Sequence, residues 1–124
     1  MQADAVRTGM IDLSVSLSAQ QLVSCDTDSL GCDGGWTERG YKYLQDAGGV
    51  ALEEDYPYTS YYADTGVCME NPDDFYMTID GYYTIASEQE MIDHVKSTGP
   101  LSACVDASTW LSYTKGVNRF TLNK

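Results

Sequence analysis

The sequence is poor in basic residues. It has seven Lys and Arg against nineteen Asp and Glu, which gives a formal net charge of −12 at pH 7. Such a chain repels phosphate groups, so neither nucleic acid nor an anionic membrane surface is expected as a partner. The sequence also lacks an apolar run of about 18 residues, so no membrane insertion is expected. Residues 1–7 (MQADAVR) lack the basic start and apolar stretch of a signal peptide.

Histidine and closely spaced cysteine pairs are equally scarce. His94 is the single histidine, and the four cysteines form no Cys-x-x-Cys pair, which argues against a zinc site. The acidic residues around Gly31 resemble a calcium loop, but Leu30 and Thr37 stand at two of the positions that such a loop needs for ligands. No metal and no other cofactor is therefore expected.

The length and the apolar content limit the possible size and type of the fold. A chain of 124 residues corresponds to one domain or part of one. Hydrophobic residues make up 43% of it and ten residues are tyrosine, so the chain can form a hydrophobic core. Four cysteines favour disulfides in an oxidising compartment, whereas no secretion signal is present. This conflict suggests that the sequence is a piece of a longer protein.

The first half of the chain is predicted to be mainly helical. A helix tail around Ala5 ends at Thr8–Gly9, and Ser18 with Gln21 forms a capping box that opens a short helix reaching Cys25. A second helix is expected over residues 36–47, because its apolar residues recur at helical spacing and two glycines follow it.

The second half is predicted to be mainly strand. Residues 50–72 have no periodicity and indicate a long loop, pinned by Cys68, before a strand over residues 75–86. Ser87 and Glu90 form a second capping box, whose helix stops at Gly99–Pro100. A buried strand over residues 101–105 and another within 113–122 complete an α+β arrangement.

Four segments in order resemble the papain-like cysteine proteases, the family that includes the cathepsins. They are residues 17–26 (LSAQQLVSCD), 31–35 (GCDGG), 48–59 (GGVALEEDYPYT) and 99–107 (GPLSACVDA). Each segment alone is weak evidence, but the order and spacing of all four over residues 3–117 make the resemblance specific.

The resemblance implies a two-lobe fold that is incomplete at both ends here. Residues 1–74 would form the helical lobe and the long loop, and residues 75–124 part of an antiparallel β-barrel lobe, with the substrate cleft between the lobes. It also implies a disulfide between Cys25 and Cys68, which would contribute about 4 kcal/mol in a chain-entropy estimate.

The other two cysteines have no such implied pairing. The family partner of Cys32 would precede this chain, so Cys32 is expected to be unpaired or to pair outside the family pattern. Cys104 is expected to be a small buried hydrophobe in a strand, with pairing to Cys32 as the alternative.

The resemblance places five residues at the substrate cleft. Gly34 and Gly35 would bring bare backbone to the cleft, where a substrate strand pairs with main-chain groups. Trp36, Leu30 and Cys104 would line the main specificity pocket and the wall beside it. All five are binding positions, and none is catalytic.

The catalytic residues of the family are not in this sequence. The nucleophilic cysteine would precede Met1, and the histidine and asparagine would follow the last barrel strands. Cys25 and Cys32 match structural positions, and His94 is expected to be an isolated helical histidine. No catalytic residue is assigned, and the chain is expected to be inactive alone.

Two functional interpretations follow. The first is the central part of a papain-like cysteine endopeptidase, which hydrolyses peptide bonds through a thiolate acyl-enzyme in a lysosomal, vacuolar or secreted setting. The second is a degenerate, non-catalytic relative that acts as a structural or binding subunit of a complex. In either case, a protein or peptide partner is expected, because an incomplete fold would leave surfaces to cover.

Overall fold

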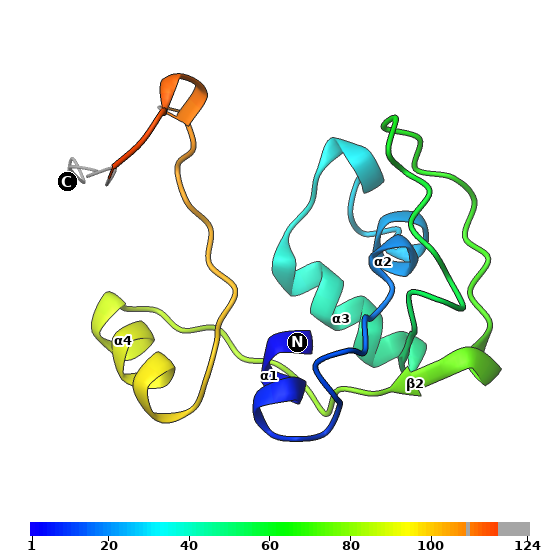
Figure 1. Cartoon of the computed structure of the whole chain (residues 1–124), viewed down its shortest axis with the longest axis horizontal. Helices are drawn as coiled ribbons and strands as arrows, with labels where there is room; N and C mark the ends of the chain where they lie inside the picture. The colour runs from blue at the N-terminus through cyan, green and yellow to red at the C-terminus, as the bar shows by residue number, and fades with distance from the viewer. Residues whose placement is uncertain (109, 117–124) are drawn as a thin grey trace.

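The computed structural model describes residues 1–108 and 110–116. Its elements, in chain order, are α1 (Gln2–Arg7), α2 (Ala19–Cys25), η1 (Gly31–Asp33), α3 (Thr37–Ala47), β1 (Val50–Ala51), η2 (Pro72–Asp74), β2 (Phe75–Met77), α4 (Glu88–Ser97) and η3 (Trp110–Ser112). Figure 1 shows α1, α2, α3 and β2 gathered in one body, with α4 and the chain that follows it set to one side. Within the described residues, no helix is long and apolar enough to cross a membrane.

The predicted helix signals are confirmed in both halves of the chain. The Ser18 hydroxyl accepts a hydrogen bond of 3.1 Å from the Gln21 amide and so caps α2. Gly48 ends α3 with a left-handed φ of 87°, a conformation that glycine adopts without steric cost. The Ser87 hydroxyl caps α4 through the Glu90 amide at 3.3 Å.

The sheet of the described chain is small. β1 pairs antiparallel with β2, Val50 opposite Met77 and Ala51 opposite Phe75, with a shift in register between the two pairs. The segment before α2 continues the pairing on the other side of β1, because the Ser18 amide donates to the Ala51 carbonyl at 2.9 Å. The two-residue strand β1 lies inside the span that we predicted to be loop.

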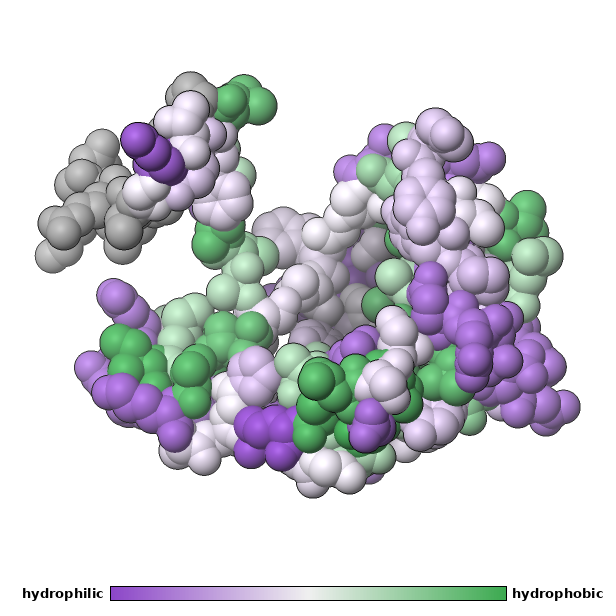
Figure 2. Space-filling model, in the orientation of Figure 1, coloured by the Kyte–Doolittle hydropathy of each residue, from purple (hydrophilic) through white to green (hydrophobic). Residues whose placement is uncertain are grey.

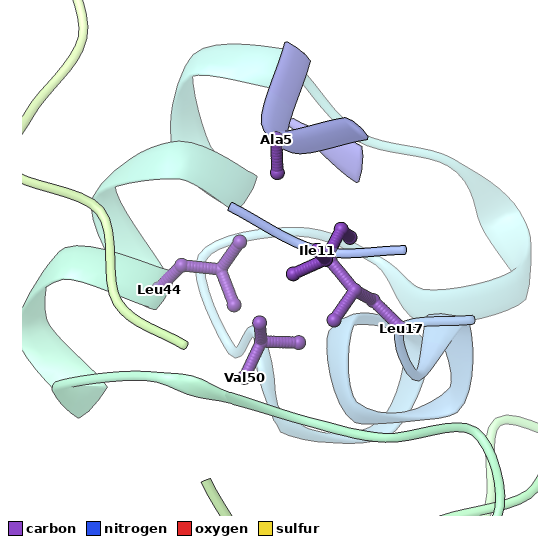
Figure 3. Packing of buried hydrophobic residues seen from close by; sticks show 5 residues of the cluster. All are labelled: Ala5, Ile11, Leu17, Leu44 and Val50. Carbon is purple, nitrogen blue, oxygen red and sulfur yellow. The ribbon is translucent and has the colours of Figure 1, made fainter. Parts of the chain in front are cut away.

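The core lies between α1, α3 and β1. Its buried residues converge on one point from five segments of the chain (Figure 3), and they are Ala5, Ile11, Leu17, Leu44 and Val50. A second cluster joins Cys25, Ala51 and Tyr56 next to the disulfide. Burial of these side chains stabilises the fold by about 25 cal/mol per Å² of apolar area removed from water.

A long loop covers α2 without forming a sheet. Residues 52–71 contain no helix or strand, and several side-chain contacts hold them, among them a disulfide and the hydrogen bonds of a buried glutamine. The Cys25–Cys68 disulfide joins residues 43 positions apart. The glutamine is Gln20, which is 1% exposed and accepts hydrogen bonds from the Thr59 and Ser60 amides at 2.7 and 3.1 Å.

The three strand predictions of the second half differ from the structure. The strand expected over 75–86 ends at Met77, because the partner strand β1 is only two residues long. Residues 101–105 form no strand, and Val105 is 62% exposed, because no neighbouring strand lies beside this apolar run in the described chain. Residues 113–116 are not a strand either, and the rest of the predicted 113–122 strand lies outside the described residues.

Candidate functional site

The candidate site is the turn between η1 and α3. Gly34 adopts a φ of 110° at the end of η1, a value that L side chains rarely reach. Its N–H donates to the Gly31 carbonyl at 3.2 Å, and its carbonyl accepts from the Leu30 amide at 2.8 Å. The turn is therefore closed on itself, and the backbone groups of Gly34 are already used.

Gly35 has a different environment. Within the described part of the chain, neither its N–H nor its carbonyl makes a hydrogen bond, and the residue is exposed. A Cβ at this position would lie 2.5 Å from Ser29 Oγ and 2.7 Å from Ser29 Cβ, so only glycine fits without a shift. The turn thus presents one free donor and one free acceptor of the main chain to solvent.

Exposed apolar side chains flank these free groups. Leu30 and Trp36 stand on either side of Gly35 in the sequence and are 68% and 61% exposed. Such exposure is costly in water, and large exposed apolar groups beside unpaired backbone are typical of binding surfaces.

The long loop, residues 52–71, contacts this turn through Thr65. The Cys32 amide donates to Thr65 Oγ1 at 3.2 Å, and the Thr65 carbonyl accepts from Ser24 Oγ of α2 at 2.6 Å. Gly31 lies against the same threonine, where a Cβ would come within 2.4 Å of the side chain. Arg39 of α3 also donates to the Asp28 carbonyl. The turn is therefore tied to α2, α3 and the long loop.

Cys104 lies apart from the other four predicted cleft residues. The expectation of a buried strand cysteine is wrong, because Cys104 is exposed and its segment has no strand partner in the described chain. It lines a cavity of about 570 Å³ between α1, α3, residues 77–85 and α4, and Figure 2 shows this face hollowed between α4 and the body. Leu30, Gly34, Gly35 and Trp36 do not line that cavity.

The cysteines and the histidine do not form a hydrogen-bonded pair. Cys25 and Cys68 share the disulfide, and among the described residues Cys32 and Cys104 are free. His94 Nδ1 lies 2.7 Å from Tyr83 Oη, and no thiol of the described chain is hydrogen-bonded to its ring. The half-buried histidine of α4 agrees with the predicted isolated helical residue.

A polar cluster beside the disulfide joins Tyr43, Glu70 and Gln21. The Tyr43 hydroxyl donates to Glu70 and accepts from Gln21 Nε2 at 3.1 Å. Burial and the Glu70 carboxylate raise the pKa of Tyr43 well above its usual 10.0, because both disfavour the phenolate. Glu70 also lies near the sulfurs of Cys25 and Cys68, but these are oxidised in the disulfide and offer no thiolate to a metal.

Sequence reasoning missed the buried glutamines that position the site. Gln21, 0% exposed, accepts from the Ala51 amide at 2.8 Å and donates to the Gly49 carbonyl at 3.1 Å. In the predicted capping box, Gln21 would have reached back to Ser18, but its side chain bonds the strand instead. The two consecutive glutamines in the first turn of the helix, Gln20 and Gln21, are the sequence feature that could have indicated buried side-chain hydrogen bonds.

Comparison with solved structures defines the class of fold. The chain is similar to digestive procathepsin L2 proteinase from the larval midgut of Tenebrio molitor, with a TM-score of 0.79 and 29% identity over 98% of this chain and 38% of that one. A second, procathepsin L 3 from the same insect midgut, matches with a TM-score of 0.62 and 30% identity over 77% of this chain and 30% of that one. The mixed helix-and-sheet arrangement is thus part of a papain-like fold.

Comparison of sequences defines the family. The model of the papain family cysteine proteases matches residues 3–123, so the chain belongs to that family. A viral cathepsin of Choristoneura fumiferana defective polyhedrosis virus is 35% identical over 90% of this chain and 34% of its own length. Digestive cysteine proteinase 1 of Homarus americanus is 40% identical over 90% of this chain and 35% of its own. The chain therefore spans about a third of the length of these relatives.

Proposed function

We propose that this chain supplies the peptide-binding turn of a papain-family cysteine peptidase. Residues 1–74 would belong to the helical lobe and residues 75–124 to part of the β lobe. The observation that carries this proposal is the exposed backbone of Gly35, whose N–H and carbonyl have no partner among the described residues. An extended peptide satisfies one donor and one acceptor of this kind by adding itself as a short strand.

The neighbouring side chains would provide the selectivity. Leu30 and Trp36 offer apolar contact area for a substrate side chain beside the paired backbone. Gly34 would keep the turn closed instead of pairing with substrate, because its own N–H and carbonyl are occupied. Cys104 lines the separate cavity beside α4 and is given no part in this turn.

Hydrolysis itself would depend on a catalytic cysteine, histidine and asparagine, roles to which no residue of this chain is assigned. In the whole protein, peptide bonds would be cleaved through a thiolate acyl-enzyme, whereas the 124-residue chain would be inactive alone. Two observations support this: His94 is engaged by Tyr83, and two of the four cysteines are held in a disulfide. The alternative, a non-catalytic subunit, is favoured by the apolar side chains that α4 leaves exposed, Ile92 at 39% and Val95 at 54%.

The compartment is proposed to be lysosomal, vacuolar or secreted. The Cys25–Cys68 disulfide supports it, because such bonds persist in oxidising compartments. The digestive relatives from lobster and mealworm point the same way.

Backbone amide shifts would test the binding proposal. We would titrate the ¹⁵N-labelled chain with acetyl-Leu-Leu-Arg-amide and follow the Gly35 amide by NMR. The Gly35 signal should shift with the peptide, and Trp36→Ala should weaken binding about tenfold. Leu13→Ala is the matched control, because Leu13 is an 82% exposed apolar residue outside residues 30–36. A Gly35 amide that stays unchanged while other signals titrate would refute the role given to this turn.

An activity assay would test the second half of the proposal. The chain should not hydrolyse a peptidyl-coumarin substrate under mildly reducing conditions. Cys104→Ser and Cys32→Ser serve as controls for trace contamination, because they remove the two free thiols. Turnover that disappears in either variant would show that the chain contains its own nucleophile, and would overturn the proposal.

A further inference from the structure

A second, smaller cavity lies where the two ends of the long loop come together. It has a volume of about 130 Å³, and its lining comes from within residues 51–57 and 69–74. This volume is well below the roughly 300 Å³ at which pockets for whole small molecules begin, so the cavity suits a single side chain. Neither α4 nor the Leu30–Trp36 turn takes part in it.

The two ends of the loop are tied to each other at this cavity. The Met69 amide donates to Tyr56 Oη at 3.1 Å, and Cys68, the residue before Met69, forms the disulfide with Cys25. Tyr56 is 9% exposed, and its carbonyl accepts from the Ser18 hydroxyl at 2.7 Å. The walls of the cavity are therefore fixed by a covalent bond and by hydrogen bonds.

The lining of this cavity combines apolar surface with two carboxylates. Tyr56, Pro57 and Met69 supply apolar surface, and Asp55 and Asp74 supply negative charge. Among the residues that the structure describes, no Lys, Arg or His lines it. An occupant that matches this lining has an apolar stem and a positively charged end.

The two carboxylates keep most of their capacity to accept hydrogen bonds. Asp55 and Asp74 belong to no ion pair of the described part of the chain. Within residues 1–108 and 110–116, the Asp55 carboxylate accepts no hydrogen bond, and the Asp74 carboxylate accepts one, from Asn71 Nδ2 at 3.0 Å. Because an ionised carboxylate can accept several hydrogen bonds, a cationic donor could bind both groups at once.

We propose that this cavity binds an arginine side chain of a partner protein. The aliphatic stem of the arginine would lie against Pro57 and Met69, and its guanidinium would donate to Asp55 and Asp74. Arginine fits better than lysine, because its planar fork of donors can reach two carboxylates and because it is more weakly hydrated. The net charge of −12 would also attract a basic partner from a distance. This inference does not depend on the proposed peptide-binding function, since it uses no residue of the Leu30–Trp36 turn.

Single-residue probes would test the proposal by NMR. The ¹⁵N-labelled full chain is titrated with Nα-acetyl-arginine amide, and the backbone amide signals of Met69 and Asp74 are followed. Binding is expected in the millimolar range, because one side chain buries little surface. Nα-acetyl-citrulline amide has nearly the same shape without the charge, and methylguanidinium has the charge without most of the stem. Each of these two probes should bind about fivefold more weakly than the arginine probe.

A matched pair of double variants locates the binding site. Asp55→Asn combined with Asp74→Asn should weaken binding of the arginine probe about tenfold. The control combines Glu54→Gln with Asp73→Asn, at the neighbouring exposed acids that do not line the cavity, and should change binding less than about twofold. Both double variants change the net charge equally, so their comparison separates the cavity from the overall charge of the chain.

Several results would overturn the proposal. Equal effects of the two double variants would place the arginine probe elsewhere, and equal binding of the arginine and citrulline probes would remove the electrostatic argument. Tighter binding of Nα-acetyl-lysine amide would contradict the choice of arginine. Shifts of the Met69 and Asp74 signals with calcium chloride, and none with the arginine probe, would assign the carboxylates to a divalent cation. Circular dichroism of each variant checks that the fold is retained.

Discussion

The buried side chain of Gln20 should be among the most sensitive positions of the chain. Gln20 is 1% exposed, and its Oε1 accepts from the Thr59 and Ser60 amides. Its Nε2 donates to Ser24 Oγ at 2.7 Å and to Ser60 Oγ at 2.8 Å. We predict that Gln20→Ala destabilises the protein by about 3 kcal/mol.

The magnitude comes from the groups that the substitution leaves behind. Removing Oε1 leaves the Thr59 and Ser60 amides of the long loop without their acceptor. An unsatisfied buried donor such as the Ser60 amide costs about 1–3 kcal/mol, and the amide of exposed Thr59 costs less because water reaches it. Ser60 is itself 4% exposed, so water reaches its amide poorly. Local movement of the loop recovers part of this loss, which is why the prediction lies below the upper limit of the sum.

Urea denaturation followed by tryptophan and tyrosine fluorescence would measure the effect under non-reducing conditions. Gln45→Ala is the matched control: Gln45 is exposed and makes a single hydrogen bond of 3.3 Å, so its loss should cost less than about 0.5 kcal/mol. If Gln20→Ala and Gln45→Ala shifted the midpoint equally, the hydrogen bonds of Gln20 would not be what holds the loop.

Other predictions address the disulfide, the tyrosine cluster and the free thiols. Reduction of Cys25–Cys68 should lower the unfolding free energy by up to about 4 kcal/mol, measured as the urea midpoint with and without thiol, and no change would contradict the loop-closure argument. Tyr43→Phe should cost about 1–3 kcal/mol by calorimetry. In the wild type, the unfolding free energy should fall as pH rises above 10. The unfolded chain then releases the phenol proton of Tyr43, whereas the folded chain retains it because the pKa of Tyr43 is raised. An unfolding free energy that stays constant in alkaline urea titrations would contradict this. In the folded protein, Cys104 should react with a thiol reagent faster than half-buried Cys32, as peptide mapping would show, and equal rates would argue against the exposed position of Cys104.

The sequence predicted best those elements that depend on neighbouring residues. The caps at Ser18 and Ser87 and the left-handed Gly48 follow from local chemistry, and the structure contains all three. The family resemblance rested on the same kind of local motif, and the match over residues 3–123 agrees with it. For the candidate site, the assignment of Leu30, Gly34, Gly35 and Trp36 to a substrate cleft stays a prediction, and Cys104 lies apart from them.

Strands and buried polar contacts were harder to predict, because they depend on distant residues. Residues 75–86 have the composition of a strand, but a strand exists only where a partner pairs with it, and β1 provides two residues. Cys104 is exposed for the same reason, because no strand of the described chain pairs with its segment. Gln20 bonds to residues 39 and 40 positions away, a contact that no local pattern reveals.

The disulfide gives the long loop a tolerance to chain cleavage. Tyr61 and Tyr62 are 76% and 96% exposed at the loop surface, where a proteolytic enzyme has ready access. A cut between them would separate Cys25 from Cys68 in sequence but not in space, because the S–S bond still joins the two pieces. The product would be a two-chain molecule that migrates as one species until a thiol is added. A nick at this loop would therefore change the covalent connectivity and leave the two pieces joined.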